Sequence, residues 1–83
     1  MHLDNLELSL KNLMMDRCGI PEEKFRPEAT LSGDLELDSL DAVELAMALE
    51  DEFNIKVTDE DMMPVRRVSD VVDLIRQLQG KAA

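Results

Sequence analysis

Aromatic and cysteine residues are scarce in this chain of 83 residues, which has two phenylalanines, no tryptophan, no tyrosine and one cysteine. Its apolar residues are mainly leucine, valine, isoleucine, methionine and alanine, a set that favours packed helices over an aromatic-rich sandwich or barrel. A single cysteine cannot form an internal disulfide, which fits the reducing environment of the cytosol. We therefore expect one small all-α domain, residues 1–83, in the cytoplasm.

Long apolar segments are missing as well. No stretch of about 18 consecutive apolar residues occurs, so the sequence predicts no membrane span. The N-terminus has no apolar stretch behind basic residues, so it predicts no secretory signal. A domain of this length buries only about 60% of its unfolded surface, so we expect a modest core.

The sequence lacks the residues that catalysis or zinc binding requires. The one histidine, His2, lies at the end of the chain and is expected to be inert, and Cys18 has no candidate base beside it. Histidine and cysteine are too few for a zinc site, and no glycine-rich phosphate loop occurs. We expect Cys18 to be a loop or core thiol, and we expect no catalytic residue and no metal site.

Three acidic residues, Asp34, Glu36 and Asp38, match the start of a calcium-binding EF-hand loop. Such a loop needs a glycine at its sixth position and a glutamate at its twelfth, where this chain has Ser39 and Leu45. The sequence therefore predicts no EF-hand and leaves open only loose binding of divalent cations by the acidic cluster.

The net charge of −10 is concentrated in the middle of the chain. Residues 34–61 contain eleven acidic residues and one basic residue, Lys56, whereas the charges of the two flanking segments cancel. Such a field repels nucleic acid and anionic membranes and attracts basic partners. We therefore expect no nucleic-acid partner; the alternative is that the charge only makes the chain soluble.

The apolar spacing predicts a four-helix bundle with three longer helices and one short helix. A first helix is expected over about residues 3–17, ending before Gly19 and Pro21. Its apolar stripe consists of Leu3, Leu6, Leu10 and Leu13. A long loop over residues 18–38 follows, and it needs internal anchors because loops of this length are uncommon. The expected anchors are Ile20, Phe25, Leu31, Leu35 and Leu37.

The second half of the chain predicts the other three helices. A second helix is expected over residues 39–53, followed by an extended connector at residues 55–57. Thr58 should cap a very short helix that Pro64 ends. Ser69 should cap a last helix that Gly80 stops. The apolar face of this last helix consists of Val71, Leu74, Ile75 and Leu78.

On a helical wheel, the predicted second helix has two apolar faces. The face expected in the core consists of Ala42, Leu45, Ala46, Leu49 and Phe53. The opposite face consists of Leu40, Val43 and Met47, with Asp41, Glu44, Glu50 and Asp51 beside it. An apolar strip bordered by carboxylates suits a partner with an apolar groove and a basic rim. The alternative is that Leu40 and Val43 cover the long loop and that Met47 fills a gap.

A serine stands at the head of this helix in the run Asp38-Ser39-Leu40-Asp41. Backbone N–H groups are unpaired at a helix N-terminus and receive phosphate well, although a serine there is more often only a cap. The longer run Asp34-Leu35-Glu36-Leu37-Asp38-Ser39-Leu40-Asp41-Ala42-Val43-Glu44-Leu45 resembles the serine site of an acyl carrier protein. The resemblance extends more loosely to Leu78, and so covers roughly the whole chain.

The resemblance implies a carrier that is not an enzyme. In this family a basic phosphopantetheinyl transferase attaches 4′-phosphopantetheine from coenzyme A to the serine, here Ser39, with Asp38 beside it. The thiol of the arm carries acyl groups as thioesters between enzymes of fatty-acid, polyketide or related biosynthesis. The residues Leu40, Asp41, Val43, Glu44, Met47, Glu50 and Asp51 would then meet basic patches on synthases, acyltransferases and acyl-loading enzymes. We expect such a carrier to be a monomer.

One position departs from the family pattern. Acyl carrier proteins usually have a glycine two or three residues before the serine, and this chain has Glu36 there. Glycine adopts a positive φ at little cost and glutamate does not, so we expect a different or strained turn and a specialised carrier. Two alternatives remain, which are a peptidyl or D-alanyl carrier with the same arm and an unmodified acidic helical adaptor.

Overall fold

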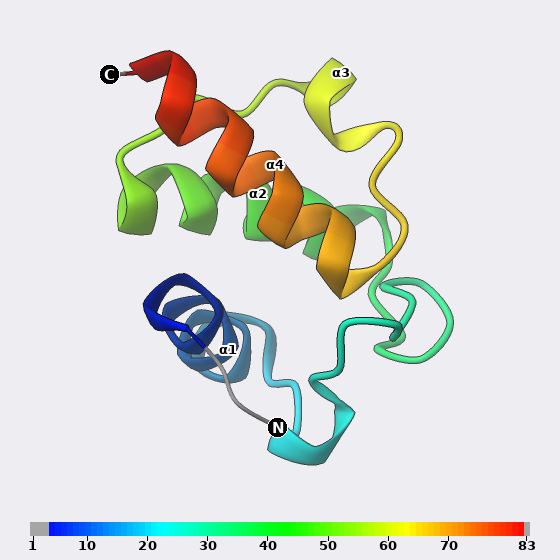
Figure 1. Cartoon of the computed structure of the whole chain (residues 1–83). Helices are drawn as coiled ribbons and strands as arrows, with labels where there is room; N and C mark the ends of the chain where they lie inside the picture. Colours follow the sequence, from blue (N-terminus) through cyan, green and yellow to red (C-terminus); the bar gives the residue numbers. More distant parts are fainter. Residues whose placement is uncertain (1–3, 83) are drawn as a thin grey trace.

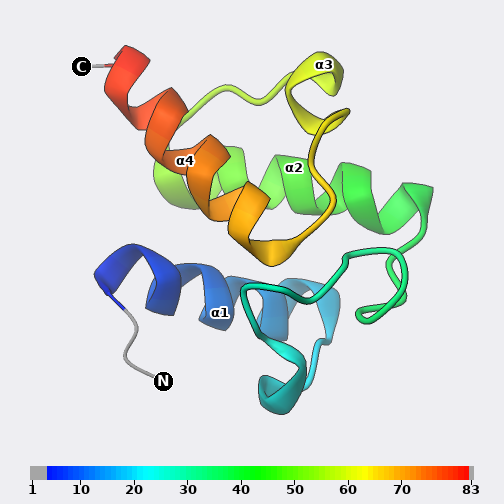
Figure 2. The same cartoon turned by 45° about the vertical axis from the view of Figure 1, so that its right-hand side comes forward.

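The computed structural model describes residues 4–82, and its helices pack around one apolar core (Figure 1). They are α1 (Asn5–Cys18), the single-turn 3-10 helix η1 (Glu22–Lys24), α2 (Ser39–Phe53), α3 (Asp59–Met62) and α4 (Val68–Ala82). Helices α1 and α2 pack against each other and α4 contacts both, while α3 is a short turn at the edge (Figure 2). The predicted all-α architecture, with three longer helices and one short helix, is confirmed.

Helix α1 begins and ends at specific capping residues. The Asp4 carboxylate accepts a hydrogen bond from the Glu7 N–H at 2.8 Å, and the Glu7 carboxylate accepts one from the Asp4 N–H at 3.3 Å. This capping box starts the helix two residues later than predicted, because Asp4 is the cap and not part of the first turn. Gly19 ends it in the left-handed conformation, with φ of 69°. The predictions for His2 and Leu3 fall outside the described residues.

The long loop between α1 and α2 is anchored as predicted. All five expected anchors are buried, namely Ile20, Phe25, Leu31, Leu35 and Leu37. The loop also bonds to the segment that leads from α3 to α4: the Leu31 N–H donates to the Arg66 carbonyl at 2.9 Å, and Thr30 and Arg67 form an isolated antiparallel bridge. These buried anchors and backbone hydrogen bonds therefore fix the position of the loop that leads into α2.

The prediction that Ser69 caps the last helix is wrong, because α4 begins at Val68 and includes Ser69. The first N–H groups of α4 are bonded by the loop instead: Val68 donates to the Ala29 carbonyl and Ser69 to the Pro27 carbonyl, both at 3.0 Å. These distant carbonyls satisfy the first N–H groups of the helix, and the Asp70 carboxylate accepts from the N–H groups of Arg66 and Arg67 just before it, both at 3.0 Å.

The prediction that Gly80 stops α4 is also wrong, because the helix continues to Ala82. A glycine permits the left-handed turn that ends many helices but does not impose it. Its cost in a helix is about 1 kcal/mol relative to alanine, which an amphipathic helix of this length can tolerate. The four predicted apolar positions of α4 are in the core or against it, with Val71 and Ile75 fully buried.

The buried face of α2 is centred differently from the prediction. Leu45, Ala48 and Leu49 are fully buried, whereas Ala42, Ala46 and Phe53 are only half-buried. Ala48 was not expected in the core. Helices α1 and α4 together cover a face of α2 that includes Ala48. The periodicity of one helix cannot specify where its two neighbouring helices will lie, so the sequence did not predict this face.

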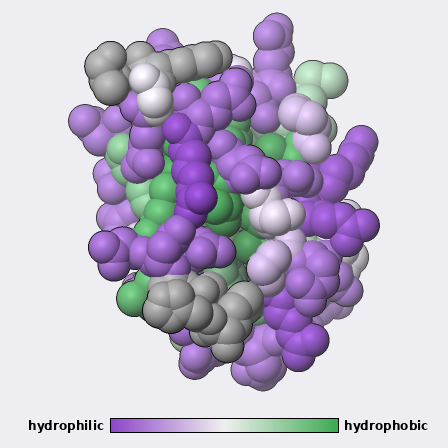
Figure 3. Space-filling view, viewed as in Figure 1, coloured by the Kyte–Doolittle hydropathy of each residue, from purple (hydrophilic) through white to green (hydrophobic). Residues whose placement is uncertain are grey.

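Polar side chains cover most of the surface in the view of Figure 3, and apolar ones show mainly toward its centre. Within residues 4–82, no helix combines the length and the apolar character needed to cross a membrane.

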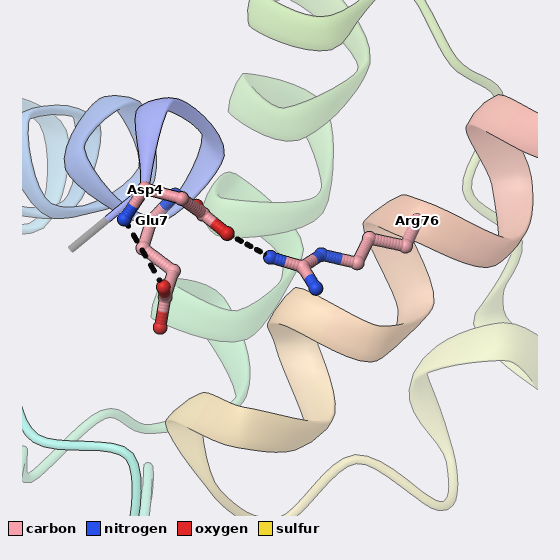
Figure 4. Close-up of polar contacts among 3 residues, drawn as sticks. All are labelled: Asp4, Glu7 and Arg76. Atoms are coloured by element: carbon pink, nitrogen blue, oxygen red, sulfur yellow. Dashed lines mark hydrogen bonds and ion pairs between the residues drawn. The ribbon is translucent and has the colours of Figure 1, made fainter.

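The start of α1 is joined to α4 by an ion pair between Asp4 and Arg76 (Figure 4). The hydrogen bond from the Glu7 N–H, together with the Arg76 guanidinium, lowers the pKa of the Asp4 carboxyl against a smaller opposing effect of desolvation. A lowered folded-state pKa stabilises the fold above the unfolded-state pKa, and this stabilisation is lost as the pH falls through the folded-state value.

We therefore expect the Asp4 contribution to be complete above about pH 5, to shrink as the pH falls below about 4, and to be absent below the lowered folded-state pKa. Asp4→Asn should lower the melting temperature at neutral pH, and the difference from wild type should shrink on acidification. Melting curves at several pH values would measure this. Asp16→Asn is the control, because Asp16 lies on the same helix without a hydrogen bond or ion pair among the described residues. A difference that stays constant down to about pH 3 would contradict the assignment.

Candidate functional site

The N-terminus of α2 is capped by Asp38, not by Ser39. The Asp38 carboxylate accepts a hydrogen bond from the Asp41 N–H at 2.9 Å, and the Asp41 carboxylate accepts one from the Asp38 N–H at 3.2 Å. This capping box leaves the Ser39 hydroxyl without a structural task in the first turn. Ser39 is exposed, and its side chain has no hydrogen-bond partner within residues 4–82. The reading of Ser39 as an N-cap is therefore excluded.

The turn before the site contains the strained residue that the sequence predicts. Glu36 has φ of 55°, in the left-handed region where a side chain costs about 1–2 kcal/mol. Its neighbours Leu35 and Leu37 are buried, and their N–H groups donate to the carbonyls of Thr30 and Leu31 at 3.0 and 2.9 Å. These contacts hold both sides of Glu36, so the turn keeps a glycine-like conformation with a glutamate in it.

Glu36→Gly should raise the free energy of unfolding by about 0.5–1 kcal/mol, because the left-handed penalty disappears while glycine adds entropy to the unfolded chain. Glu36 also pairs with Lys24 at 3.8 Å, but both side chains are largely exposed, so this pair adds little. Glu36→Ala is the matched control, since it removes the pair and keeps the strain. Urea unfolding would measure both variants, and a glycine variant no more stable than the alanine variant would show that the turn is relaxed.

A cavity of about 450 Å³ lies beside Ser39, between the long loop, the start of α2 and the segment from α3 to α4. Its lining consists of Leu31, Ser32, Leu37, Asp38, Ser39, Ala42, Met62, Val65 and Arg66. Leu31 and Leu37 are buried, whereas Ser32, Ser39 and Arg66 are exposed. The cavity therefore has an apolar inner part and a polar rim that includes the Ser39 hydroxyl.

Of these lining residues, only Asp38 and Ser39 were predicted for the site from the sequence. Met62, Val65 and Arg66 are distant from Ser39 along the chain, and no local motif relates them to it. Only the packing of the loop on the α3–α4 segment brings them to the serine.

The second apolar face of α2 is exposed as predicted. The exposed fractions are 79% for Leu40, 55% for Val43 and 58% for Met47. The alternative, in which these residues cover the loop or fill the core, is therefore wrong. Among the predicted acidic neighbours of this strip, Glu44 and Asp51 are exposed.

The other two acidic neighbours bond within the chain. Asp41 belongs to the capping box of α2, and the Glu50 carboxylate accepts a hydrogen bond from the Val57 N–H at 2.9 Å. Glu50 thereby fixes the extended connector after α2. Both residues are half-buried, so Glu44 and Asp51 are the carboxylates of this group that are freest to meet a partner.

The single cysteine is placed for packing. Cys18 is the last residue of α1 and is half-buried against the core. Burial raises the pKa of its thiol, and the carboxylates of Asp41 and Glu44 raise it further, while Arg17 opposes them. A raised pKa keeps the thiol protonated and unreactive near neutral pH.

No group of three or more histidine, cysteine, aspartate or glutamate residues is arranged to hold a metal ion in the described part of the chain. Two residues of the acidic run bond within the chain: the Asp34 carboxylate accepts from the Thr30 N–H at 2.9 Å, and Asp38 caps α2.

Known proteins resemble this chain over most of its length. A family model described as a phosphopantetheine attachment site matches residues 9–75. The acyl carrier protein of Nitratidesulfovibrio vulgaris (strain DP4) is 37% identical over 75 residues, which cover 90% of this chain and 99% of that protein. The acyl carrier protein of Buchnera aphidicola subsp. Baizongia pistaciae is 40% identical over 75 residues, covering 90% of this chain and 96% of that protein.

A solved structure shares the same fold. The crystal structure of an acyl carrier protein from Thermotoga maritima matches with a TM-score of 0.82 at 24% identity, covering 99% of this chain and 100% of that one.

Proposed function

Because the chain belongs to the acyl carrier protein family, we propose that 4′-phosphopantetheine is attached to the Ser39 hydroxyl and that the protein is a carrier. The observation that carries the proposal is an exposed serine whose hydroxyl bonds to nothing in the described structure, at the rim of a cavity. The protein is then a substrate of a phosphopantetheinyl transferase and of acyl-handling enzymes, without a catalytic residue of its own.

The residues around Ser39 fit a phosphopantetheine group. A phosphodiester on Ser39 would stand in the first turn of α2, where backbone N–H groups and the helix dipole favour an anion. The adjoining cavity has apolar walls at Leu31 and Leu37, against which an extended organic arm or its cargo can lie. Asp38 belongs to this cofactor site as the residue that fixes the turn and leaves the Ser39 hydroxyl free.

The attachment requires no activation by the carrier. A bond forms between the Ser39 oxygen and the phosphorus next to pantetheine, the pyrophosphate bond of coenzyme A breaks, and the nucleotide half leaves. The hydroxyl proton passes to a base on the transferase, so Ser39 needs no base of its own. Once attached, the arm supplies a thiol that holds acyl groups as thioesters.

The exposed strip of Leu40, Val43 and Met47 is the surface that we propose for partner enzymes. Glu44 and Asp51 border it, and Asp41 and Glu50 lie on the same helix, so the helix offers an apolar centre with an acidic edge. A partner with an apolar groove and a basic rim complements both features. The transferase and synthases, acyltransferases or acyl-loading enzymes of fatty-acid, polyketide or related biosynthesis are the proposed partners.

Intact-mass measurement tests the proposed function. After incubation with coenzyme A, magnesium and a broad-specificity phosphopantetheinyl transferase, the protein should gain the mass of one arm, and fragment masses should place it on Ser39. A mass that does not change would overturn the proposal in favour of an unmodified acidic adaptor. If the arm is gained, loading with aminoacyl groups and not with acyl groups would favour a peptidyl or D-alanyl carrier.

A further inference from the structure

One cation lies among the residues that surround Ser39. Of the nine residues that line the cavity, Asp38 is the acid and Arg66 is the only base. Arg66 comes from the segment between α3 and α4, and the cavity separates it from the start of α2. In a chain with a net charge of −10, an arginine in the lining of a cavity at the acidic end of α2 is a specific feature of this site.

The backbone of Arg66 is fixed while its side chain is free to turn to the cavity. Its carbonyl accepts from the Leu31 N–H at 2.9 Å, and its N–H donates to the Asp70 carboxylate at 3.0 Å. The side chain is exposed and makes no hydrogen bond or ion pair with another described residue. The neighbouring Arg67 differs, because its guanidinium donates to the Glu28 carbonyl at 2.8 Å and thereby holds the loop.

A phosphodiester on Ser39 would create a need for such a cation. It would add a negative charge between Asp38 and Asp41, whose carboxylates already occupy the first turn of α2. Charges of the same sign this close along the chain repel one another even in water. A guanidinium offers several donors in a planar fork that matches phosphate oxygens, so arginine is well suited to balance this charge.

We propose that Arg66 is a positioning residue that binds the phosphodiester of the arm on Ser39 and holds the start of the arm at the cavity rim. This rests on the proposed function, because the anion it binds is the group attached there. The interaction ties the α3–α4 segment to the start of α2 only in the modified protein. The arm should therefore stabilise the fold through Arg66 and not merely add charge to it.

The test compares the melting temperature of the unmodified and modified forms of wild type, Arg66→Gln, Arg66→Lys and Arg26→Gln. Arg26 is the matched control, because its loss changes the net charge equally and it lines a different cavity. The change in melting temperature that the arm causes should be about 2–4 °C more positive in wild type than in Arg66→Gln, as expected for a partly exposed charge pair. Arg66→Lys should keep part of this difference, and Arg26→Gln should behave as wild type. The difference should vanish in about 1 M salt.

A second measurement uses only the wild-type protein, so it remains valid even if a variant fails to fold. In NMR spectra of the wild-type protein, the side-chain Nε–Hε signal of Arg66 should shift on modification and that of Arg26 should not. An unmoved Arg66 signal, or an Arg66→Gln variant with the wild-type melting change, would overturn this inference while leaving the carrier proposal intact. A wild-type protein that gains no arm would instead overturn the carrier proposal, and the role of Arg66 with it.

Discussion

Ser39→Ala should abolish the gain of the phosphopantetheine arm completely and leave the fold unchanged. The hydroxyl is the proposed attachment point, so no other group at that position can form the phosphodiester. The fold should not suffer, because Asp38 and not Ser39 caps α2 and the Ser39 side chain bonds to nothing among the described residues. We expect the free energy of unfolding to change by less than about 0.5 kcal/mol, as for other exposed positions. Intact mass and urea unfolding measure the two halves of this expectation.

Ser32→Ala is the matched control for this experiment. Ser32 is also exposed and lines the same cavity from the side of the loop. It should gain the arm as wild type does, because it is not at the N-terminus of α2. An arm found on Ser9, Ser32 or Ser69 of the Ser39→Ala protein would contradict the assignment of the site.

Leu49→Ala and Met47→Ala should separate folding from recognition on the same helix. Leu49 is fully buried and Met47 is 58% exposed, although they are two positions apart. Leu49→Ala should lower the free energy of unfolding by about 2–5 kcal/mol, a large part of the stability of so small a domain. Met47→Ala should change it by less than about 0.5 kcal/mol, because its side chain is outside the core. Urea unfolding curves of the two variants would measure these changes.

For binding of the transferase the order should be reversed, with the larger effect in Met47→Ala and the smaller one in Leu49→Ala. Met47→Ala removes the centre of the exposed strip and should weaken the productive interaction with the transferase, measured as a lower kcat/KM for attachment of the arm. Leu49→Ala, assayed where it is folded, should keep most of this value. A Met47 variant that is modified at the wild-type rate would show that this partner does not use the strip.

The exposed strip and the site serine illustrate what a local pattern can predict. Leu40, Val43 and Met47 share a face because helix periodicity is a property of the chain itself, and the apolar residues of the long loop are buried because water excludes them wherever the loop lies. The strain at Glu36 was also predictable, since the resemblance placed a glycine there and the backbone still adopts its conformation. The prediction at Ser69 failed because distant loop carbonyls bond the first N–H groups of α4, and the prediction at Gly80 failed because a glycine permits a helix end without imposing one.

By itself, then, the sequence determined the helices, the serine at the head of the acidic helix and the apolar strip beside it, because each depends on residues within a few positions of one another. Only the tertiary structure decided that Asp38 frees the Ser39 hydroxyl beside a cavity, that loop carbonyls bond the first N–H groups of α4, and that Arg66 lines the same cavity as Ser39. Those features join segments far apart in the chain, and their geometry follows from how the loop packs between α2 and the start of α4, which no local pattern encodes.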